Sequence, residues 1–149
     1  MSFSQLKLLP SLLKSIEENG YKKPTAIQEK VIPLVLEKKD VMAQAQTGSG
    51  KTASFVLPMI QEILENKTKG KAKIKALILT PTRELSLQIT QTFDMFSKYC
   101  NKRLKVVSLI GGEQIGDQLH SIQQGCDIVV ATSGRLLDIL SKKQMNLSF

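Results

Sequence analysis

The chain has 149 residues, of which 42% are hydrophobic, and this fits one ordinary domain with enough core to fold alone. No apolar run reaches the length of a membrane span and the N-terminus lacks the pattern of a secretion signal, so we expect a cytoplasmic protein. Two cysteines and one histidine fit a reduced compartment and cannot supply zinc-ligand spacing. The net charge of +8 fits either a polyanionic partner such as nucleic acid or lysines that only solubilise the surface.

The predicted elements alternate between helices and strands. Hydrophobic periodicity and turn residues place them, in chain order, as helices over about 8–18 and 25–38, a strand over 40–45, a helix over 51–65, a strand over 76–79, a helix that carries Leu85 to Phe96, a strand over 104–110, a helix over 115–124, a strand over 127–131 and a helix over 136–141. This alternation predicts an α/β fold, with a parallel sheet flanked by helices on both faces.

Three of these segments carry further expectations. Residues 76–79 form a continuous apolar run, which predicts a strand buried on both faces of the sheet. In the second helix the residues expected to face inward are Ile27, Val31, Leu34 and Val35. The lysine-rich stretch 66–73 is typical of a solvated connection, and a nucleic-acid role for it is the less favoured alternative.

The start of the second helix has its own signal. Thr25 is expected to be the N-cap, and Gln28 three residues later completes a capping box. Gly20 is expected to end the preceding helix. On this interpretation both Thr25 and Gln28 are structural.

The most informative stretch joins the predicted strand over 40–45 to the predicted helix over 51–65. Its sequence is Ala45-Gln46-Thr47-Gly48-Ser49-Gly50-Lys51-Thr52. A glycine-rich loop between a strand and a helix, followed by Gly-Lys-Thr, is typical of a phosphate-binding loop. The first position of the general pattern is Gly, whereas this chain has Ala. The alternative is a glycine turn that binds nothing.

The residue types of this loop suit phosphate chemistry. Gly48 and Gly50 permit backbone angles that point successive N–H groups into one concavity, and the following helix adds its positive end. Lys51 supplies a charge for the β- and γ-phosphates, and the Thr52 hydroxyl can bind Mg²⁺. Lys51 and Thr52 are therefore the candidate catalytic residues, with Thr52 as the candidate metal ligand. The loop predicts a nucleoside triphosphate but does not select the base.

Three further loops follow predicted strands, so all four loops are expected at one edge of the sheet, where ligands of such folds bind. They are Pro81-Thr82-Arg83-Glu84, Gly111-Gly112 and Thr132-Ser133-Gly134-Arg135. Backbone N–H groups, hydroxyls and guanidinium groups suit phosphates and do not read bases. Each loop alone is also compatible with an ordinary turn.

Together these motifs resemble those of the DEAD-box RNA helicases, specifically their first RecA-like domain. Residues 20–28 with Phe3 upstream resemble the Q motif, residues 45–52 motif I, and residues 81–85 motif Ia. Residues 111–112 resemble the double-glycine motif and residues 132–135 motif Ib. The Ala at the start of the phosphate loop is usual in this family. Residues 1–149 are then expected to form an N-terminal, RecA-like ATP-binding domain that is incomplete at its C-terminus.

The resemblance implies roles for individual residues. Gln28 is expected to hydrogen-bond the adenine edge, with Tyr21 against the base, Phe3 supporting the pocket and Lys23 in the same motif, so that the nucleotide is ATP with Mg²⁺. The whole of residues 46–52 is expected to contact the nucleotide. The residues expected to hold the backbone of one RNA strand are Pro81, Thr82, Arg83, Gly111, Gly112, Thr132, Gly134 and Arg135. Glu84 is expected to order its loop by pairing with an arginine.

The sequence also departs from the family pattern. Ser133 stands where motif Ib usually has Pro, which predicts a looser loop, and Ser86 stands where motif Ia continues with Ala. The Asp-Glu-Ala-Asp motif, the Ser-Ala-Thr motif and the second RecA-like domain do not occur before Phe149. The expectation is therefore a monomeric fragment of an ATP-dependent RNA helicase that binds nucleotide weakly, does not hydrolyse ATP alone and has an incomplete sheet.

Two other functions stay open. The chain could be a binding module that holds RNA or a partner without ATP turnover, and continuation of the reading frame past Phe149 would argue against this. It could also belong to a DNA helicase or translocase, which the Q motif disfavours. The sequence does not indicate which RNA or cellular process is involved.

Overall fold

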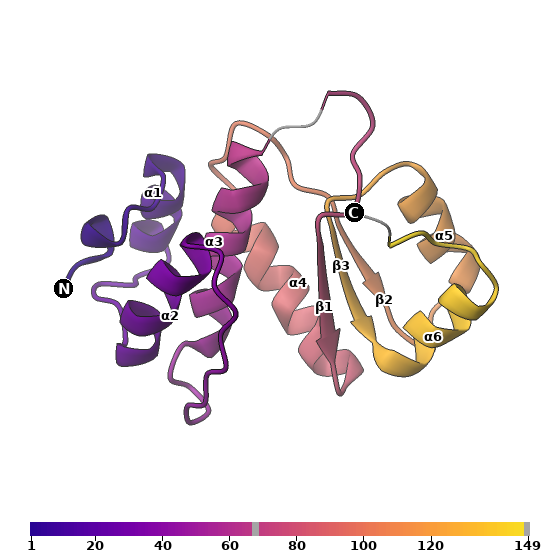
Figure 1. Ribbon diagram of the computed structural model, residues 1–149, viewed down its shortest axis with the longest axis horizontal. Coiled ribbons are helices and arrows are strands. Elements are labelled where there is room, and N and C mark those ends of the chain that lie inside the picture. The colour runs from indigo at the N-terminus through magenta and orange to yellow at the C-terminus, as the bar shows by residue number, and fades with distance from the viewer. Residues whose placement is uncertain (67–68, 148–149) are drawn as a thin grey trace. The chain divides into compact units, whose positions relative to one another are not determined.

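A computed structural model describes residues 1–66 and 69–147 (Figure 1). The chain divides into two units, one of Met1–Lys67 with Thr92–Arg103 and one of Thr68–Gln91 with Leu104–Phe149. Helix α4 (Arg83–Ser97) contributes its first turns to the second unit and its last turns to the first. Residues 67 and 68, which belong to the predicted lysine-rich connection, lie outside the described residues.

The first unit is helical. It contains the 3₁₀ helix η1 (Phe3–Leu6) and the helices α1 (Pro10–Glu18), α2 (Ala26–Leu36) and α3 (Lys51–Glu65) (Figure 1). Helices α2 and α3 pack against each other. Apolar side chains from each of these elements and from the end of α4 are buried, among them Leu6, Leu12, Ile32, Ile60 and Phe96.

One buried amide ties the start of this unit to α3. The Gln61 side chain accepts a hydrogen bond from the Leu9 backbone N–H at 2.9 Å and donates one to the Lys7 carbonyl at 3.0 Å. These two backbone groups lie between η1 and α1, where no helical partner exists for them. Gln61 therefore satisfies polar groups that burial would otherwise leave unpaired.

The structure corrects two expectations in this unit. Leu34 does not face inward, because its side chain is 36% exposed, and Ile32 is fully buried instead. Residues 40–45 do not form a strand: they are irregular and nearly all exposed, including Val41 and Met42. A strand needs a hydrogen-bonded neighbour, and no strand in the described part of the chain pairs with this apolar segment.

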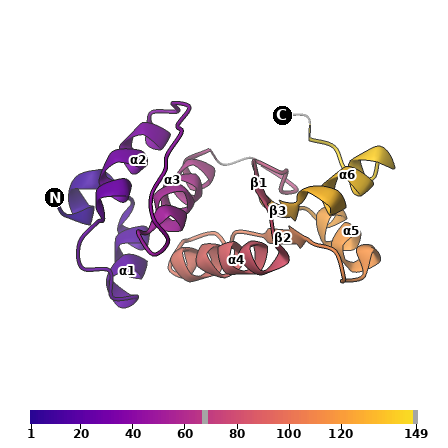
Figure 2. The same ribbon diagram turned by 90° about the horizontal axis from the view of Figure 1, so that it is seen from below.

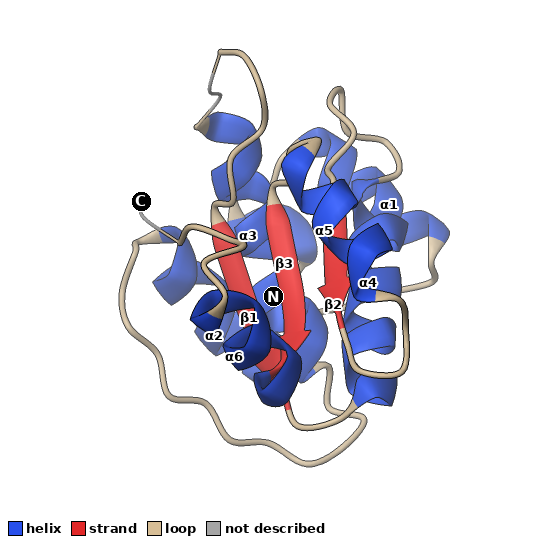
Figure 3. Ribbon diagram, turned by 90° about the vertical axis from the view of Figure 1, so that its right-hand side faces the viewer, coloured by secondary structure: helices blue, strands red, loops and turns tan. Residues whose placement is uncertain are grey.

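The second unit contains the sheet. Its strands are β1 (Ala76–Thr80), β2 (Val106–Leu109) and β3 (Ile128–Thr132), and they run parallel in the order β1-β3-β2 (Figure 3). Ala76 and Val106 are both in register with Ile128, so the three strands start at the same level. Their carboxyl ends therefore meet at one edge.

Helices cover both faces of this sheet, as the sequence predicts. Helices α5 (Ile115–Gln123) and α6 (Ser133–Ser141) pack on one face, where Leu119 and Ile139 join a core with Val129 and Leu109 (Figure 2). The first turns of α4 lie on the other face, because Thr90 Oγ1 on α4 is 2.8 Å from Ser108 Oγ on β2. The α/β prediction with a parallel sheet is confirmed.

The strand buried on both faces is β3 and not β1. All of β3 except its last residue is buried, since it has a strand on either side and helices above and below. Among the described residues strand β1 pairs with β3 alone, and Leu79 is 58% exposed. The apolar run at 76–79 thus predicts a strand correctly but misplaces it in the sheet.

Cys100 and Cys126 are both free thiols. Cys126 lies in the core of the second unit, and burial raises the pKa of its thiol to about 11, with the neighbouring Asp127 carboxylate adding to the effect. The thiol therefore stays protonated and packs as a small apolar group. Within the described ranges, no helix is both long and apolar enough to cross a bilayer.

Hydrogen exchange should separate the irregular segment from the central strand. The backbone N–H groups of residues 41–46 have no hydrogen-bond acceptor among the described residues, and they are expected to exchange at close to unfolded-chain rates. Residues 128–131 are expected to be protected by at least about a thousandfold more, because they open only with the sheet. Mass spectrometry of exchanged peptides measures both. Protection of residues 41–46 comparable to that of β3 would contradict the irregular, unpaired conformation.

Candidate functional site

The glycine-rich loop has the backbone geometry that its sequence predicts. Gly48 and Gly50 have φ angles of +82° and +85°, a region that side chains rarely adopt, and α3 begins at Lys51. A Cβ atom at Gly50 would lie 2.3 Å from Gln28 Nε2, so a side chain is excluded there by contact as well. The loop therefore presents its backbone at the positive end of a fifteen-residue helix.

The side chains around this loop fit an anion. Ser49 Oγ is buried and has no hydrogen-bond partner among the described residues, so it has a hydroxyl available to a ligand. The Lys51 ammonium folds back onto the Ala45 carbonyl across the loop. No acidic residue occupies the first turn of α3 to neutralise its N-terminus. Thr52 follows in that turn and is partly exposed. These groups could hold a phosphate chain with its metal ion.

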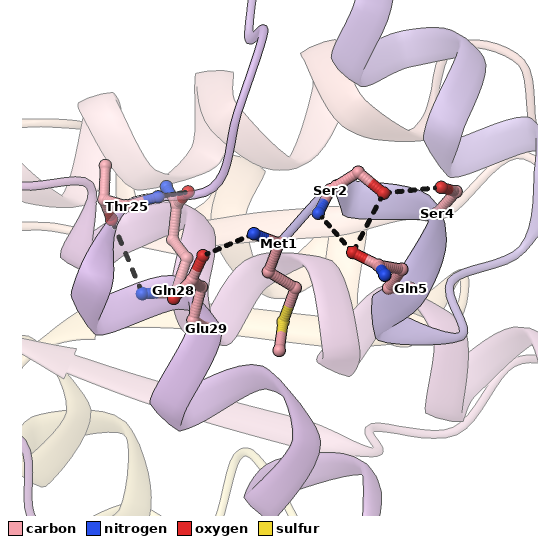
Figure 4. Close-up of polar contacts among 7 residues, drawn as sticks. All are labelled: Met1, Ser2, Ser4, Gln5, Thr25, Gln28 and Glu29. Carbon is pink, nitrogen blue, oxygen red and sulfur yellow. Dashed lines mark hydrogen bonds and ion pairs between the residues drawn. The ribbon is translucent and has the colours of Figure 1, made fainter.

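Gln28 is fully buried at the start of α2 (Figure 4). Its Oε1 accepts from the Thr25 backbone N–H at 3.0 Å, while Thr25 Oγ1 accepts from the Gln28 backbone N–H at 3.4 Å. The predicted capping box is thus confirmed. The same side chain also donates from Nε2 to the Gly50 carbonyl at 3.2 Å, which the sequence did not indicate. Gln28 therefore joins the start of α2 to the phosphate loop.

The residues expected around an adenine are only partly brought together. Phe3 and Tyr21 line one cavity of about 490 Å³ with Gly20 and Lys22. The Tyr21 ring lies 5.5 Å from the Phe96 ring, centroid to centroid, and remains partly exposed. Lys23 is exposed, and Gln28 is not among the residues that line this cavity. The reason is that both ends of the Gln28 amide are already engaged inside the unit.

Met1 adds a contact at the same end of α2. Its terminal ammonium lies 3.7 Å from a Glu29 carboxylate oxygen, and both groups are partly exposed (Figure 4). An exposed pair of this kind contributes little to stability. It nevertheless shows that the N-terminal residues of the chain lie beside the first turn of α2 in this unit.

In the second unit, the three loops predicted to bind phosphates gather around one cavity. The cavity has a volume of about 640 Å³ and is lined by Pro81, Thr82, Arg83, Glu84, Gly111, Thr132, Gly134, Arg135 and Asp138. The parallel register of the three strands brings these residues to the same edge of the sheet. The expectation that these three loops converge is confirmed. The phosphate loop belongs to the first unit and does not follow a strand, so the prediction that all four loops follow strands of one sheet is wrong for this loop.

Two of the three segments are helix starts rather than loops. Arg83 and Glu84 begin α4, and Thr82 Oγ1 accepts from the Leu85 N–H at 3.2 Å as an N-terminal cap. Ser133, Gly134 and Arg135 form the first turn of α6. Ser133 therefore begins a helix and does not lie in a loop, while the looser backbone expected from this residue stays a prediction. Two helix N-termini now point toward the cavity, which suits an anion.

Ser86 is also accommodated. It is fully buried and its hydroxyl contacts Thr80 Oγ1 and donates to the Thr82 carbonyl at 3.2 Å. The hydroxyl that replaces the usual Ala thus finds partners within the turn between β1 and α4. It stabilises the segment that carries Arg83.

The Arg83 guanidinium lies against the backbone of Gly111 and Gly112. A Cβ atom would lie 3.2 Å from the Arg83 guanidinium at Gly111 and 2.5 Å from it at Gly112. Gly112 also has a φ of +83°. Glycine at 112 is therefore required by the backbone angle, and a side chain there would also displace the Arg83 guanidinium. Arg83 packs on the loop after β2, and among the described residues no ion pair joins it to Glu84.

Sequence reasoning missed three residues near this cavity. Gln118 on α5 is 5% exposed and hydrogen-bonds Arg135, and the Glu113 carbonyl accepts from the same guanidinium. Asp138 lines the cavity and pairs with Lys142 at 3.3 Å. The sequence signal for Gln118 was its position between the apolar residues Ile115 and Ile122 on the inner face of α5.

A family model described as DEAD/DEAH box helicase matches residues 25–149. The chain belongs to the DEAD/DEAH box helicase family. This confirms the resemblance inferred from the motifs, and the family match includes both the phosphate loop and the cavity of the second unit.

Individual relatives agree. The chain is 47% identical over 147 residues to the ATP-dependent RNA helicase DeaD of Buchnera aphidicola, covering 99% of this chain and 24% of that protein. It is 45% identical over 148 residues to DEAD-box ATP-dependent RNA helicase 21 of Oryza sativa, covering 95% of this chain and 19% of that protein. A crystal structure of a DEAD box protein from Methanococcus jannaschii matches with a TM-score of 0.88 and 42% identity, covering 99% of this chain and 39% of that one. The chain thus spans a quarter or less of these two curated relatives.

Replacing Gly112 tests the packing of Arg83. Gly112→Ala is expected to lower the free energy of unfolding by about 1–2 kcal/mol from backbone strain alone, and to displace the guanidinium. Gly116→Ala is the matched control: it lies in α5 with nothing within 4 Å, and it is expected to stabilise by up to about 1 kcal/mol. Urea unfolding of both variants measures the difference. Equal stability of the two would contradict the contact.

Removing the Gln28 amide tests its structural role. Gln28→Ala removes a fully buried amide with its hydrogen bonds to the Thr25 N–H and the Gly50 carbonyl, and is expected to cost about 1–3 kcal/mol of unfolding free energy. Gln46→Ala removes an exposed amide from the neighbouring loop and is expected to change stability by less than about 0.5 kcal/mol. If Gln28→Ala proves as mild as the control in the same unfolding measurement, the link between α2 and the phosphate loop is not structural.

Proposed function

We propose that this chain is the first RecA-like domain of an ATP-dependent RNA helicase. The observation that carries the proposal is the cavity of the second unit, where three strand ends and two helix N-termini gather around two arginines. Its lining offers two guanidinium groups, hydroxyls and backbone, together with the carboxylates of Glu84 and Asp138, and contains no aromatic ring for a base. Such a surface suits the sugar-phosphate backbone of a nucleic acid without regard to its sequence.

The phosphate loop is proposed to bind ATP. The backbone of residues 46–50 would surround the phosphates, Ser49 would use its unpartnered hydroxyl, and Lys51 would leave the Ala45 carbonyl for the β- and γ-phosphates. Thr52 would bind the Mg²⁺ that accompanies them. When bound, Mg²⁺–ATP supplies the phosphoryl-transfer chemistry, and this chain's residues bind and orient it.

Adenine selection is proposed for the Q motif. Tyr21 is exposed enough to lie against a base, and the buried Phe3 side chain lines the same cavity. Gln28 keeps one N–H and one lone pair beyond its two side-chain hydrogen bonds, and these match the donor–acceptor edge of adenine. Because Gln28 is buried, binding through it requires the side chain or the adjoining loop to shift. Lys23 is placed at the exposed rim of this motif.

One RNA strand is proposed to occupy the cavity of the second unit. Arg83 and Arg135 would pair with phosphates, and the amides of the Gly111–Gly112 loop and of the first turn of α6 would bind others. The remaining contacts are proposed for Pro81, Thr82, Thr132 and Gly134. A second RecA-like domain is the proposed partner in the whole protein. Free thiols at Cys100 and Cys126 support action in the reducing cytoplasm.

Calorimetric titration with ADP and GDP tests the nucleotide half of this proposal. The chain is expected to bind ADP in preference to GDP. Lys51→Ala is expected to weaken ADP binding by roughly tenfold or more, because a charged hydrogen-bond donor to phosphate is lost. Gln28→Ala is expected to reduce the preference for adenine.

Lys30→Ala is the charge-matched control, since Lys30 is an exposed lysine of α2, and it is expected to leave ADP affinity unchanged. A folded chain that binds neither nucleotide would overturn the assignment of the phosphate loop. Equal affinity for ADP and GDP would overturn the adenine pocket alone.

A further inference from the structure

We propose that Gln118 positions Arg135 for the RNA backbone and locks the loop after β2 to the start of α6. This rests on the proposed function of the second unit. Gln118 belongs to none of the motifs recognised in the sequence, and its side chain is nearly buried at 5% exposure. It does not line the cavity that holds Arg135, so it would act through other residues.

The Gln118 amide makes contacts on both of its ends. Nε2 donates to the Ile110 carbonyl at 3.0 Å and to a Glu113 carboxylate oxygen at 3.2 Å. Oε1 accepts from the Arg135 guanidinium at 3.3 Å. The second guanidinium nitrogen of Arg135 donates to the Glu113 carbonyl at 3.3 Å. One side chain therefore connects the end of β2, the loop that follows it and the first turn of α6.

These contacts hold Arg135 by two of its nitrogens while it still lines the cavity. A guanidinium carries five N–H donors in a planar fork, so two anchored nitrogens leave donors for a phosphate. The anchored fork has lost most of its rotational freedom before a ligand arrives. Binding then costs less conformational entropy than it would for a free arginine.

The chemistry requires an amide at position 118. The site needs a donor toward the Ile110 carbonyl and the Glu113 carboxylate, and an acceptor toward Arg135. A carboxylate would repel Glu113, and an apolar side chain would leave a carbonyl and a guanidinium nitrogen unpaired. Gln118 also occupies the Glu113 carboxylate, which would otherwise compete with phosphate for Arg135. The neutral Gln118 amide thus separates the Glu113 carboxylate from the Arg135 guanidinium, which needs to face the ligand.

Gln118 also holds the loop after β2 in place. The Gly111–Gly112 loop lies between Arg83 on one side and the Gln118 contacts at Ile110 and Glu113 on the other. Phosphate-binding groups from β2 and β3 are therefore held as one surface. Without Gln118, Arg135 would keep its charge but lose its fixed direction.

Fluorescence anisotropy with a labelled single-stranded RNA, measured over a range of salt concentrations, tests this inference. Gln118→Ala is expected to weaken RNA binding about tenfold and to lower the slope of log K against log [salt] by roughly one phosphate contact. Arg135→Ala is expected to do the same. The double variant is expected to lose less affinity than the two single losses combined, because part of the effect of Gln118 acts through Arg135.

Two further variants separate positioning from folding. Gln118→Met keeps the volume of the side chain without its hydrogen bonds and is expected to lose RNA affinity as Gln118→Ala does, so a loss of fold in one variant does not end the test. Gln123→Ala removes an exposed glutamine from the same helix and is expected to match the wild type. ADP affinity is expected to be unchanged in all of them, since the phosphate loop lies in the other unit.

The outcomes are distinct. Wild-type affinity in both Gln118 variants, an unchanged salt slope, or fully additive losses in the double variant would overturn the role of Gln118 while leaving the RNA proposal standing. Failure of the folded wild-type chain to bind RNA at all would overturn the RNA proposal, and the role of Gln118 with it.

Discussion

The parallel pairing of β1 and β2 on either side of β3 is the constraint on which the second unit depends. Because the three strands share one register, their carboxyl ends lie at one level, and segments separated by up to about fifty residues meet there. Parallel strands require long crossover connections, which here are helices packed on the sheet. The cavity is thus a product of the sheet, and each of its groups is placed by a strand end or a helix start.

Two kinds of backbone site result from this fold. In the first unit, Gly48 and Gly50 adopt positive φ angles so that a loop can turn directly into α3. In the second unit, Gly112 does so beneath the Arg83 guanidinium. Each loop contains a glycine that is needed for two reasons. One is the backbone angle of the turn, and the other is a side chain that lies close to the backbone, which is Gln28 at Gly50 and Arg83 at Gly112. The phosphate loop is fixed by a buried amide from Gln28, and the double-glycine loop by the amide of Gln118.

These buried amides follow a common physical rule. Gln28, Gln61 and Gln118 are neutral, and each uses both a donor and an acceptor to hold polar groups of loops and helix starts. An amide can satisfy a carbonyl and an N–H or guanidinium group at once, without the desolvation penalty of a buried charge. This explains how irregular segments that carry glycine can be rigid. It also means that the residues that shape a binding surface need not touch the ligand.

Local signals in the sequence determined the helices, the helix caps and the conformation of the glycines, because each of these depends on residues a few positions apart. The capping box at Thr25 and Gln28 and the start of α3 at Lys51 follow from such spacing. The convergence of the segments at Arg83, Gly111 and Arg135 also followed from sequence, since alternating helices and strands specify a parallel sheet. Tertiary structure alone decided which apolar run became the central strand. It left residues 40–45 without a pairing strand among the described residues, and it put β1 at the edge although β1 is as apolar as β3. It also decided the second partners of Gln28 and Gln118, because hydrogen bonds over long sequence separations depend on packing, which no local pattern records.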